Sequence, residues 1–322
     1  MGHPGIAVIH GAQTKMVLVL YQVYRYRYPG SSDSCGRRRT MPFPGITRLS
    51  SPGRPVEVAI SPDETFCLVS NSDRHNVSRF DLATGEKVAV YEGGVRNPAQ
   101  IAISASGTCC LICSPTAARV TMLNLRTGAM MQQFDGLDSV AGVVLCPGEK
   151  FALAHCVEPM ARIRNIPNAI ARLDLSLRKV SWPFPAVHTS GRSLAVSKCG
   201  SFLLCTDTAN SKVCKVSLQN GTVVEEYVVR LAHGISIAPT LDYALVGCTG
   251  TSILRIDLDR ARVDADAFAR DAEDKPFEGA YGVAIATSGR FALVANSFGD
   301  SVSLIDMRPP EERGAPASAP GK

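Results

Sequence analysis

A unit of about 42 residues occurs six times in this chain, and this repetition constrains the fold more than any other feature. An apolar residue ahead of the first turn recurs at Ile60, Ile103, Leu145, Val196, Ile237 and Ile285. A second apolar residue, near the end of each unit, recurs at Leu82, Leu125, Leu175, Leu218, Leu258 and Met307. Because both anchors keep the same order and nearly the same period, the chain is expected to repeat one structural element.

Each unit predicts four short strands. In the first unit the apolar runs are "VEVAIS", "FCLVS", "VSRFDL" and "KVAVY", and the segments between them are "PDET", "NSDRHN" and "ATGE". Short runs rich in Val and Ile, separated by Pro, Asp, Asn and Gly turns, are typical of antiparallel strands and too short for a helical repeat. Four strands per unit, repeated around a ring, predict an all-β fold: a β-propeller with six four-stranded blades.

The last unit predicts how the ring closes. It supplies three strands and then meets Pro309 and Pro310, so its outer strand must come from elsewhere. The segment "ITRLSS", residues 46–51, precedes the first unit and is predicted to pair with residues 302–305, which covers an otherwise unpaired edge. The competing interpretation is a seventh blade built from residues 5–26. The predicted organisation is a basic extension at 1–45, a propeller at 46–308 and a disordered tail at 309–322.

Composition narrows the class of protein. The chain has 45% hydrophobic and 20% charged residues, as expected of a globular protein, and its net charge of +5 is located in residues 1–45. The neutral remainder argues against nucleic-acid binding, and the N-terminal apolar run is too short for a membrane span. The eleven cysteines lie mostly in apolar runs, which favours reduced core residues in a cytoplasmic protein. Cys110 and Cys113 should point to opposite faces of a strand, so no metal or other cofactor is expected.

The repeat resembles a known family. "ISPDETFCLVSNSDRHNVSRFDLATGEKV" and "VAIATSGRFALVANSFGDSVSLIDM" are similar to the YVTN-type β-propeller repeat, and the likeness covers about four fifths of the chain. WD40-like repeats fit less well, because no Trp-Asp dipeptide occurs and Trp182 is the single tryptophan. The resemblance implies a binding propeller of the wider lactonase-like and NHL-like group. Enzymes of this group have their sites at the mouth of the central channel, but no motif of theirs is present.

The candidate site residues are found by aligning the residues at the start of the first strand of each unit. Counted from the apolar anchor, Arg192, His233 and Tyr281 occupy one equivalent position, four residues before it, and Glu57 and Gln100 occupy the next, three residues before it. Arg192 would hold a carboxylate or phosphate, His233 would act as a general base, and Glu57 would orient it. Small residues at neighbouring positions, among them Gly142, Gly234 and Gly282, would leave room for a ligand. The opposing interpretation is that polar side chains at a wet channel rim need no function.

The loops after the second strands carry further oxygen ligands, namely Asn71, Asp73, Asp207, Asn210, Asn296 and Asp300. They would suit a hard cation, but such residues also favour turns by bonding to their own backbone, and no metal is predicted. The functional prediction is a non-catalytic scaffold that binds a protein partner or a ligand, using insertions at 157–170 and 264–280. The alternative is a lactonase-like hydrolase or lyase acting on a small molecule at the channel mouth.

Overall fold

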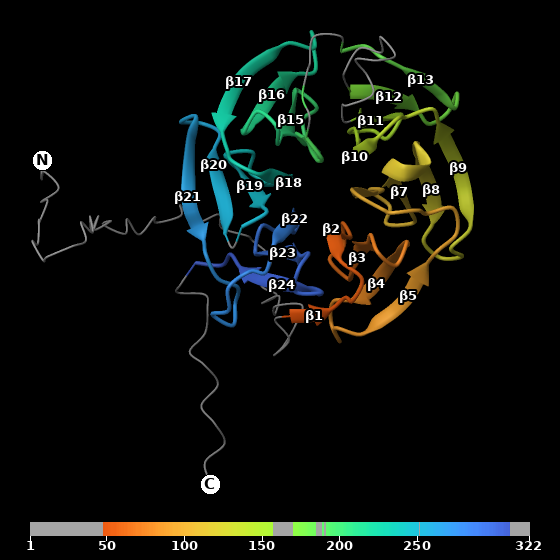
Figure 1. The fold of residues 1–322 in the computed structure, drawn as a ribbon. Coiled ribbons are helices and arrows are strands. Elements are labelled where there is room, and N and C mark those ends of the chain that lie inside the picture. Colours follow the sequence, from red (N-terminus) through yellow and green to blue (C-terminus); the bar gives the residue numbers. More distant parts are fainter. Residues whose placement is uncertain (1–47, 157–169, 185–188, 190, 251, 310–322) are drawn as a thin grey trace, which may run out of the picture. The chain divides into compact units, whose positions relative to one another are not determined.

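The computed structural model describes residues 48–309 except 157–169, 185–188, 190 and 251. It confirms an all-β propeller of six four-stranded antiparallel blades (Figure 1). All the described strands belong to one compact unit, Arg39–Arg308. The predicted 1–45 extension lies outside the described residues, as does the predicted tail apart from Pro309. The described part of the chain contains no helix long and apolar enough to cross a membrane.

The first three blades are consecutive in sequence. Their strands, from the channel outward, are β2 (Pro55–Ile60), β3 (Phe66–Asn71), β4 (Asn76–Asp81) and β5 (Lys87–Tyr91); β6 (Ile101–Ile103), β7 (Cys109–Ser114), β8 (Arg119–Asn124) and β9 (Met130–Asp135); and β10 (Val140–Leu145), β11 (Phe151–Cys156), β12 (Ile170–Asp174) and β13 (Lys179–Ser181). A 3-10 turn, η1 (Pro115–Ala117), joins β7 to β8.

The other three blades follow the same plan, except that the last takes its outer strand from the N-terminal side. Their strands are β14 (Leu194–Val196), β15 (Phe202–Asp207), β16 (Lys212–Ser217) and β17 (Val223–Val228); β18 (Ala232–Ile237), β19 (Tyr243–Cys248), β20 (Ile253–Asp257) and β21 (Arg262–Phe268); and β22 (Ala280–Ile285), β23 (Phe291–Asn296), β24 (Ser301–Asp306) and β1 (Arg48–Ser50).

The closing strand lies where the sequence predicts it. Strand β1 pairs antiparallel with β24, and Leu49 is opposite Val302 in the register. Leu49 also packs into an apolar cluster that joins the sixth blade to the first. The ring is therefore complete with six blades, and the seven-blade alternative is wrong for this unit.

The core consists of apolar layers between neighbouring blades. Each of the six clusters of buried residues joins two adjacent blades, so each second strand is covered on both faces. Strand β3 is buried along its whole length, whereas β5 at the outer edge exposes Val88 and Val90. Cys110 and Cys113 lie in two different clusters, on opposite faces of β7 as expected.

Candidate functional site

The five predicted site residues all lie at the entries of innermost strands. Glu57 is in β2, His233 in β18 and Tyr281 in β22, while Gln100 lies one residue before β6 and Arg192 two residues before β14. In an up-and-down blade the entry loop and the loop between the second and third strands are at the same end. These residues therefore share one face of the ring, which we call the channel-mouth face.

His233 and Tyr281 form the centre of the group. Their rings are stacked, with centroids 4.2 Å apart and planes inclined by 27°. Glycine at 234 permits this approach of β18 to β22, because a Cβ atom there would lie 2.5 Å from the Tyr281 carbonyl oxygen. The stack is thus built into the packing of two adjacent innermost strands.

The surroundings of His233 keep its ring neutral. Burial, and then the positive charges of Arg192 and Arg54, lower the pKa of His233 to about 4. The side chain is 9% exposed, and its buried Nδ1 atom has no hydrogen-bond partner among the described residues. His233 is consequently an uncharged imidazole near neutral pH.

Two residues that the sequence analysis missed complete this group. Arg54 is exposed in the loop before β2, where the Asp300 carboxylate accepts hydrogen bonds from the backbone N–H groups of Gly53 and Arg54. Phe298 is 64% exposed, and its ring lies edge-on to Tyr281 with centroids 5.9 Å apart. An aromatic residue in the otherwise polar turn "NSFGD" was the signal that could have identified Phe298.

Glu57 is buried in the channel wall. One carboxylate oxygen accepts a hydrogen bond from the Val58 N–H at 3.2 Å, and burial raises the pKa of Glu57 to about 8. The same oxygen would lie 2.5 Å from a Cβ atom at position 282, so Gly282 makes room for this side chain. No hydrogen bond within the described residues joins Glu57 to His233. The structure therefore does not bring the expected orienting pair into direct contact.

Gln100 holds three blades together. Its amide nitrogen donates to Ser193 Oγ at 2.9 Å and to the Leu194 carbonyl at 2.8 Å. Its amide oxygen accepts hydrogen bonds from the backbone N–H groups of Val143 and Leu194. This side chain passes over Gly142, where a Cβ atom would be 3.2 Å from the Gln100 oxygen. The space beside the channel glycines is thus filled by neighbouring residues and not left for a ligand.

The asparagines after the second strands bond mainly to side chains of the adjacent strand. Asn71 donates to Asn76 and Ser78, and Asn296 donates to Ser301 and Ser303. Asp207 instead binds Asn210 within its own turn. Within the described ranges, no three His, Cys, Asp or Glu side chains are arranged to hold a metal ion.

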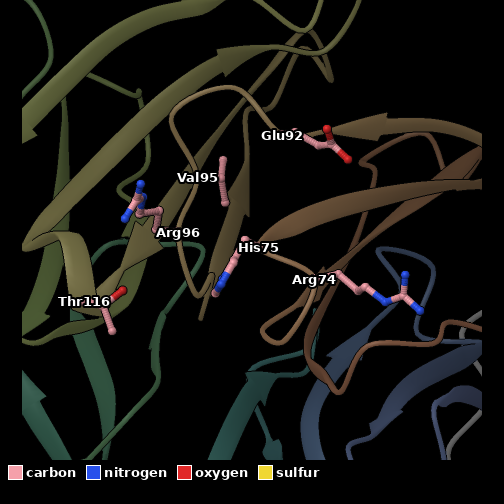
Figure 2. Close-up of a pocket in the computed structure, with 6 residues that line it drawn as sticks. All are labelled: Arg74, His75, Glu92, Val95, Arg96 and Thr116. Atoms are coloured by element: carbon pink, nitrogen blue, oxygen red, sulfur yellow. The ribbon is translucent and has the colours of Figure 1, made fainter.

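A pocket between the first two blades was not anticipated from the sequence. It has a volume of about 600 Å³ and opens among the loops of the channel-mouth face. Its lining residues, drawn in Figure 2, are Arg74, His75, Glu92, Val95, Arg96 and Thr116. Three of them carry basic groups, but these come from two separate loops, Arg74 and His75 from one and Arg96 from the other, so no compact sequence motif marks the pocket.

Comparisons with known proteins define the fold and no more. No protein-family model matches this sequence, and no curated protein is significantly similar to it. Among solved structures, a chain of Kuenenia stuttgartiensis hydrazine synthase superposes with a TM-score of 0.61 at 16% sequence identity. The alignment covers 86% of this chain and 99% of that chain. At this identity the likeness establishes a shared fold, and a propeller fold by itself is consistent with a scaffold or binding role.

Proposed function

We propose that this protein is a non-catalytic binding propeller, built from YVTN-type repeats, that holds an anionic ligand at its channel mouth. The observation that carries the proposal is the stack of His233 on Tyr281, together with the positive charges of Arg192 and Arg54 that lower the pKa of His233. Both arginines are exposed, and neither forms an ion pair within the described residues. Two unpaired guanidinium groups acting on one buried imidazole favour a bound negative charge.

The chemistry of the group indicates what kind of anion fits. A guanidinium binds a carboxylate through two parallel hydrogen bonds, which favours a ligand with a carboxylate facing Arg192. The exposed ring of Phe298 and the ring of Tyr281 offer an apolar surface to the body of the ligand. A small molecule carrying a carboxylate and a planar or apolar body therefore suits the site, as does an acidic side chain of a partner protein.

Calorimetric titration with benzoate and hexanoate tests the proposal, using wild type and Arg192→Gln. We expect saturable binding to the wild type and about tenfold weaker binding to the variant, because one charge-assisted hydrogen-bond pair is lost. Arg126→Gln is the matched control, since Arg126 is exposed in the turn between β8 and β9, at the opposite end of the blade. If both variants weaken ligand binding equally, the loss comes from the change in net charge, and this would contradict a site at Arg192.

A protein partner is tested separately by affinity capture with the whole chain. Wild type is compared with Arg192→Gln and with a form lacking residues 158–169, which lie outside the described residues. A partner retained by the wild type and lost with Arg192→Gln would place an acidic segment at the channel mouth. A partner lost only with the deletion would move the interaction to the insertion and away from this site.

One observation favours the alternative of a lactonase-like hydrolase or lyase. The neutral ring of His233, with its unpartnered Nδ1, has the protonation state that a general base requires. The assay is lactone hydrolysis by wild type and His233→Gln. A large loss of turnover in the variant would support catalysis, whereas equal turnover in both proteins would exclude His233 as the base.

A further inference from the structure

The pocket between blades one and two shares no lining residue with the channel-mouth group. Arg74 and His75 belong to the loop between β3 and β4, and Thr116 lies in η1 between β7 and β8. Glu92, Val95 and Arg96 belong to the loop that connects β5 to β6. Three loops from two blades thus meet around one cavity of about 600 Å³, a volume within the range of small-ligand sites.

The loop that carries Arg96 is anchored to both blades. The backbone N–H of Arg96 donates to Ser114 Oγ at 3.3 Å, and the N–H of Asn97 donates to His75 Nδ1 at 3.1 Å. Val95 beside them is 4% exposed and packs into the cluster between the two blades. The Arg96 backbone is therefore held in place before any ligand arrives, which lowers the entropy cost of binding.

The bond from Asn97 also fixes the hydrogen-bonding role of His75. Because Nδ1 accepts a hydrogen bond, the proton of the neutral ring is carried by Nε2. His75 thus presents an N–H donor from its other nitrogen. Together with the hydroxyl of Thr116 and the guanidinium of Arg96, this makes three donors from three different loops.

The second guanidinium is positioned by a glycine. The stem of Arg74 lies over Gly53, and a Cβ atom on residue 53 would be 2.1 Å from Arg74 Cγ. Gly53 has a φ of +111°, a conformation that also favours glycine. In Figure 2, Arg96 and Thr116 lie on one side of His75, and Arg74 and Glu92 on the other.

The charges of the pocket favour an anion. Arg74 and Arg96 form no ion pair with any described carboxylate, and Glu92 forms none with a described base. Two guanidinium groups and one carboxylate leave an excess of positive charge. A phosphoryl group has three terminal oxygens pointing in different directions, whereas a carboxylate has two in one plane, so donors arriving from three loops suit the phosphoryl group better.

We propose that this pocket is a second binding site, specific for a phosphate monoester whose phosphoryl group contacts Arg96, His75 Nε2 and Thr116. The remainder of the ligand extends towards Arg74 and Glu92, where the carboxylate accepts a hydrogen bond from a hydroxyl or amino group. The site does not depend on the function proposed for the channel mouth. A phosphate monoester occurs both as a free metabolite and as a phosphorylated side chain.

Calorimetric titration of the full chain with inorganic phosphate, O-phosphoserine and a phosphoserine peptide tests this site, with acetate as the carboxylate control. We expect the phosphorylated probes to bind and acetate to bind at least tenfold more weakly. Arg96→Gln should weaken O-phosphoserine binding about tenfold or more, because hydrogen bonds from one charged donor are lost. Arg96→Lys keeps the charge but loses the planar guanidinium, so its affinity for O-phosphoserine should lie between those of wild type and Arg96→Gln.

One control variant separates this site from an effect of net charge. Arg126→Gln should leave O-phosphoserine affinity unchanged. If the peptide binds more than tenfold tighter than O-phosphoserine, the phosphate belongs to a protein, and otherwise it belongs to a free metabolite. The proposal is overturned if no phosphorylated probe binds, if acetate binds equally well, or if Arg96→Gln and Arg126→Gln weaken binding equally. Thermal melting of each variant confirms that it is folded.

Discussion

The ring-closing seam and the channel mouth use charged side chains in opposite ways. At the seam, Arg48 of β1 binds the buried carboxylate of Asp271 at 3.1 Å. The other Asp271 oxygen accepts hydrogen bonds from the Glu273 and Lys275 N–H groups. At the channel mouth, Arg54 and Arg192 have no such partner among the described residues. Charges that hold the fold are paired internally, and those left unpaired on the channel-mouth face are available to a ligand.

The seam also explains the insertion at 264–280. Asp271 lies in this segment, and its carboxylate accepts a hydrogen bond from Ser303 Oγ at 2.9 Å in β24. Asn296 of β23 in turn donates to Ser303 at 2.8 Å. A chain of contacts therefore runs from the insertion across β24 to the closing strand β1. This insertion therefore contributes to closing the ring.

Deletion of the closing strand should have the largest effect. Removing residues 1–40 should leave the melting temperature nearly unchanged, because β1 and its pairing with β24 are kept. Removing residues 1–50 should abolish cooperative folding or lower stability by several hydrogen bonds at about 1 kcal/mol each, and expose the edge of β24. Thermal melting with size-exclusion chromatography measures both effects. An equally large loss with the shorter deletion would assign ring closure to the N-terminal segment.

Arg48→Gln should have the next largest effect. It leaves the Asp271 carboxylate buried without its cation, and the free energy of unfolding should fall by about 2–3 kcal/mol. Arg119→Gln is the control, because its partner Asp135 is 60% exposed at the side chain and the pair should contribute less than about 1 kcal/mol. Urea unfolding distinguishes them, and equal losses would mean that the seam pair is no different from a surface pair.

Glu57 should make stability fall as the pH rises. Its pKa is about 8 in the folded protein and near 4.5 when unfolded, so the folded state holds an extra proton between these values. The pKa values of His155 and His233 are lowered to about 4, so these residues change stability mainly below pH 6.5. Relative to Glu57→Gln, wild type should lose about 2 kcal/mol between pH 6.5 and pH 8. Urea unfolding at both values measures this, and a constant difference would contradict the shift.

The sequence allowed the fold to be predicted because each blade carries its own strand and turn signals. The Asp81 carboxylate, for example, accepts hydrogen bonds from the Ala83 and Thr84 N–H groups and forms the turn that "ATGE" indicated. The site was harder to predict. Aligning the repeats placed Glu57 and Gln100 at the right strand entries, but it did not predict which residues they contact. The surroundings of Glu57 depend on how closely β22 approaches β2, and the contacts of Gln100 depend on how blades three and four approach blade two, which no local pattern in one strand encodes.

Cys199 should be the most reactive thiol of the described residues, although its alkylation should not alter the fold. It is exposed in the turn between β14 and β15, where hydrogen bonding with the Ser197 and Ser201 side chains lowers its pKa to about 7. Burial raises the pKa of Cys67 and Cys113. Iodoacetamide at pH 7.5 with peptide mass mapping should label Cys199 first, since the thiolate reacts. Earlier labelling of a core cysteine would indicate that the blades open.

The free energy of unfolding of Arg54→Gln/Arg192→Gln, measured by urea titration beside wild type, tests the central comparison most directly. If the channel-mouth charges serve binding and not the fold, the double variant should match wild type within about 0.5 kcal/mol or be slightly more stable, since two cations that repel each other are removed. A loss of about 2 kcal/mol or more, as expected for Arg48→Gln, would show that these arginines stabilise the ring and would contradict a ligand site at the channel mouth.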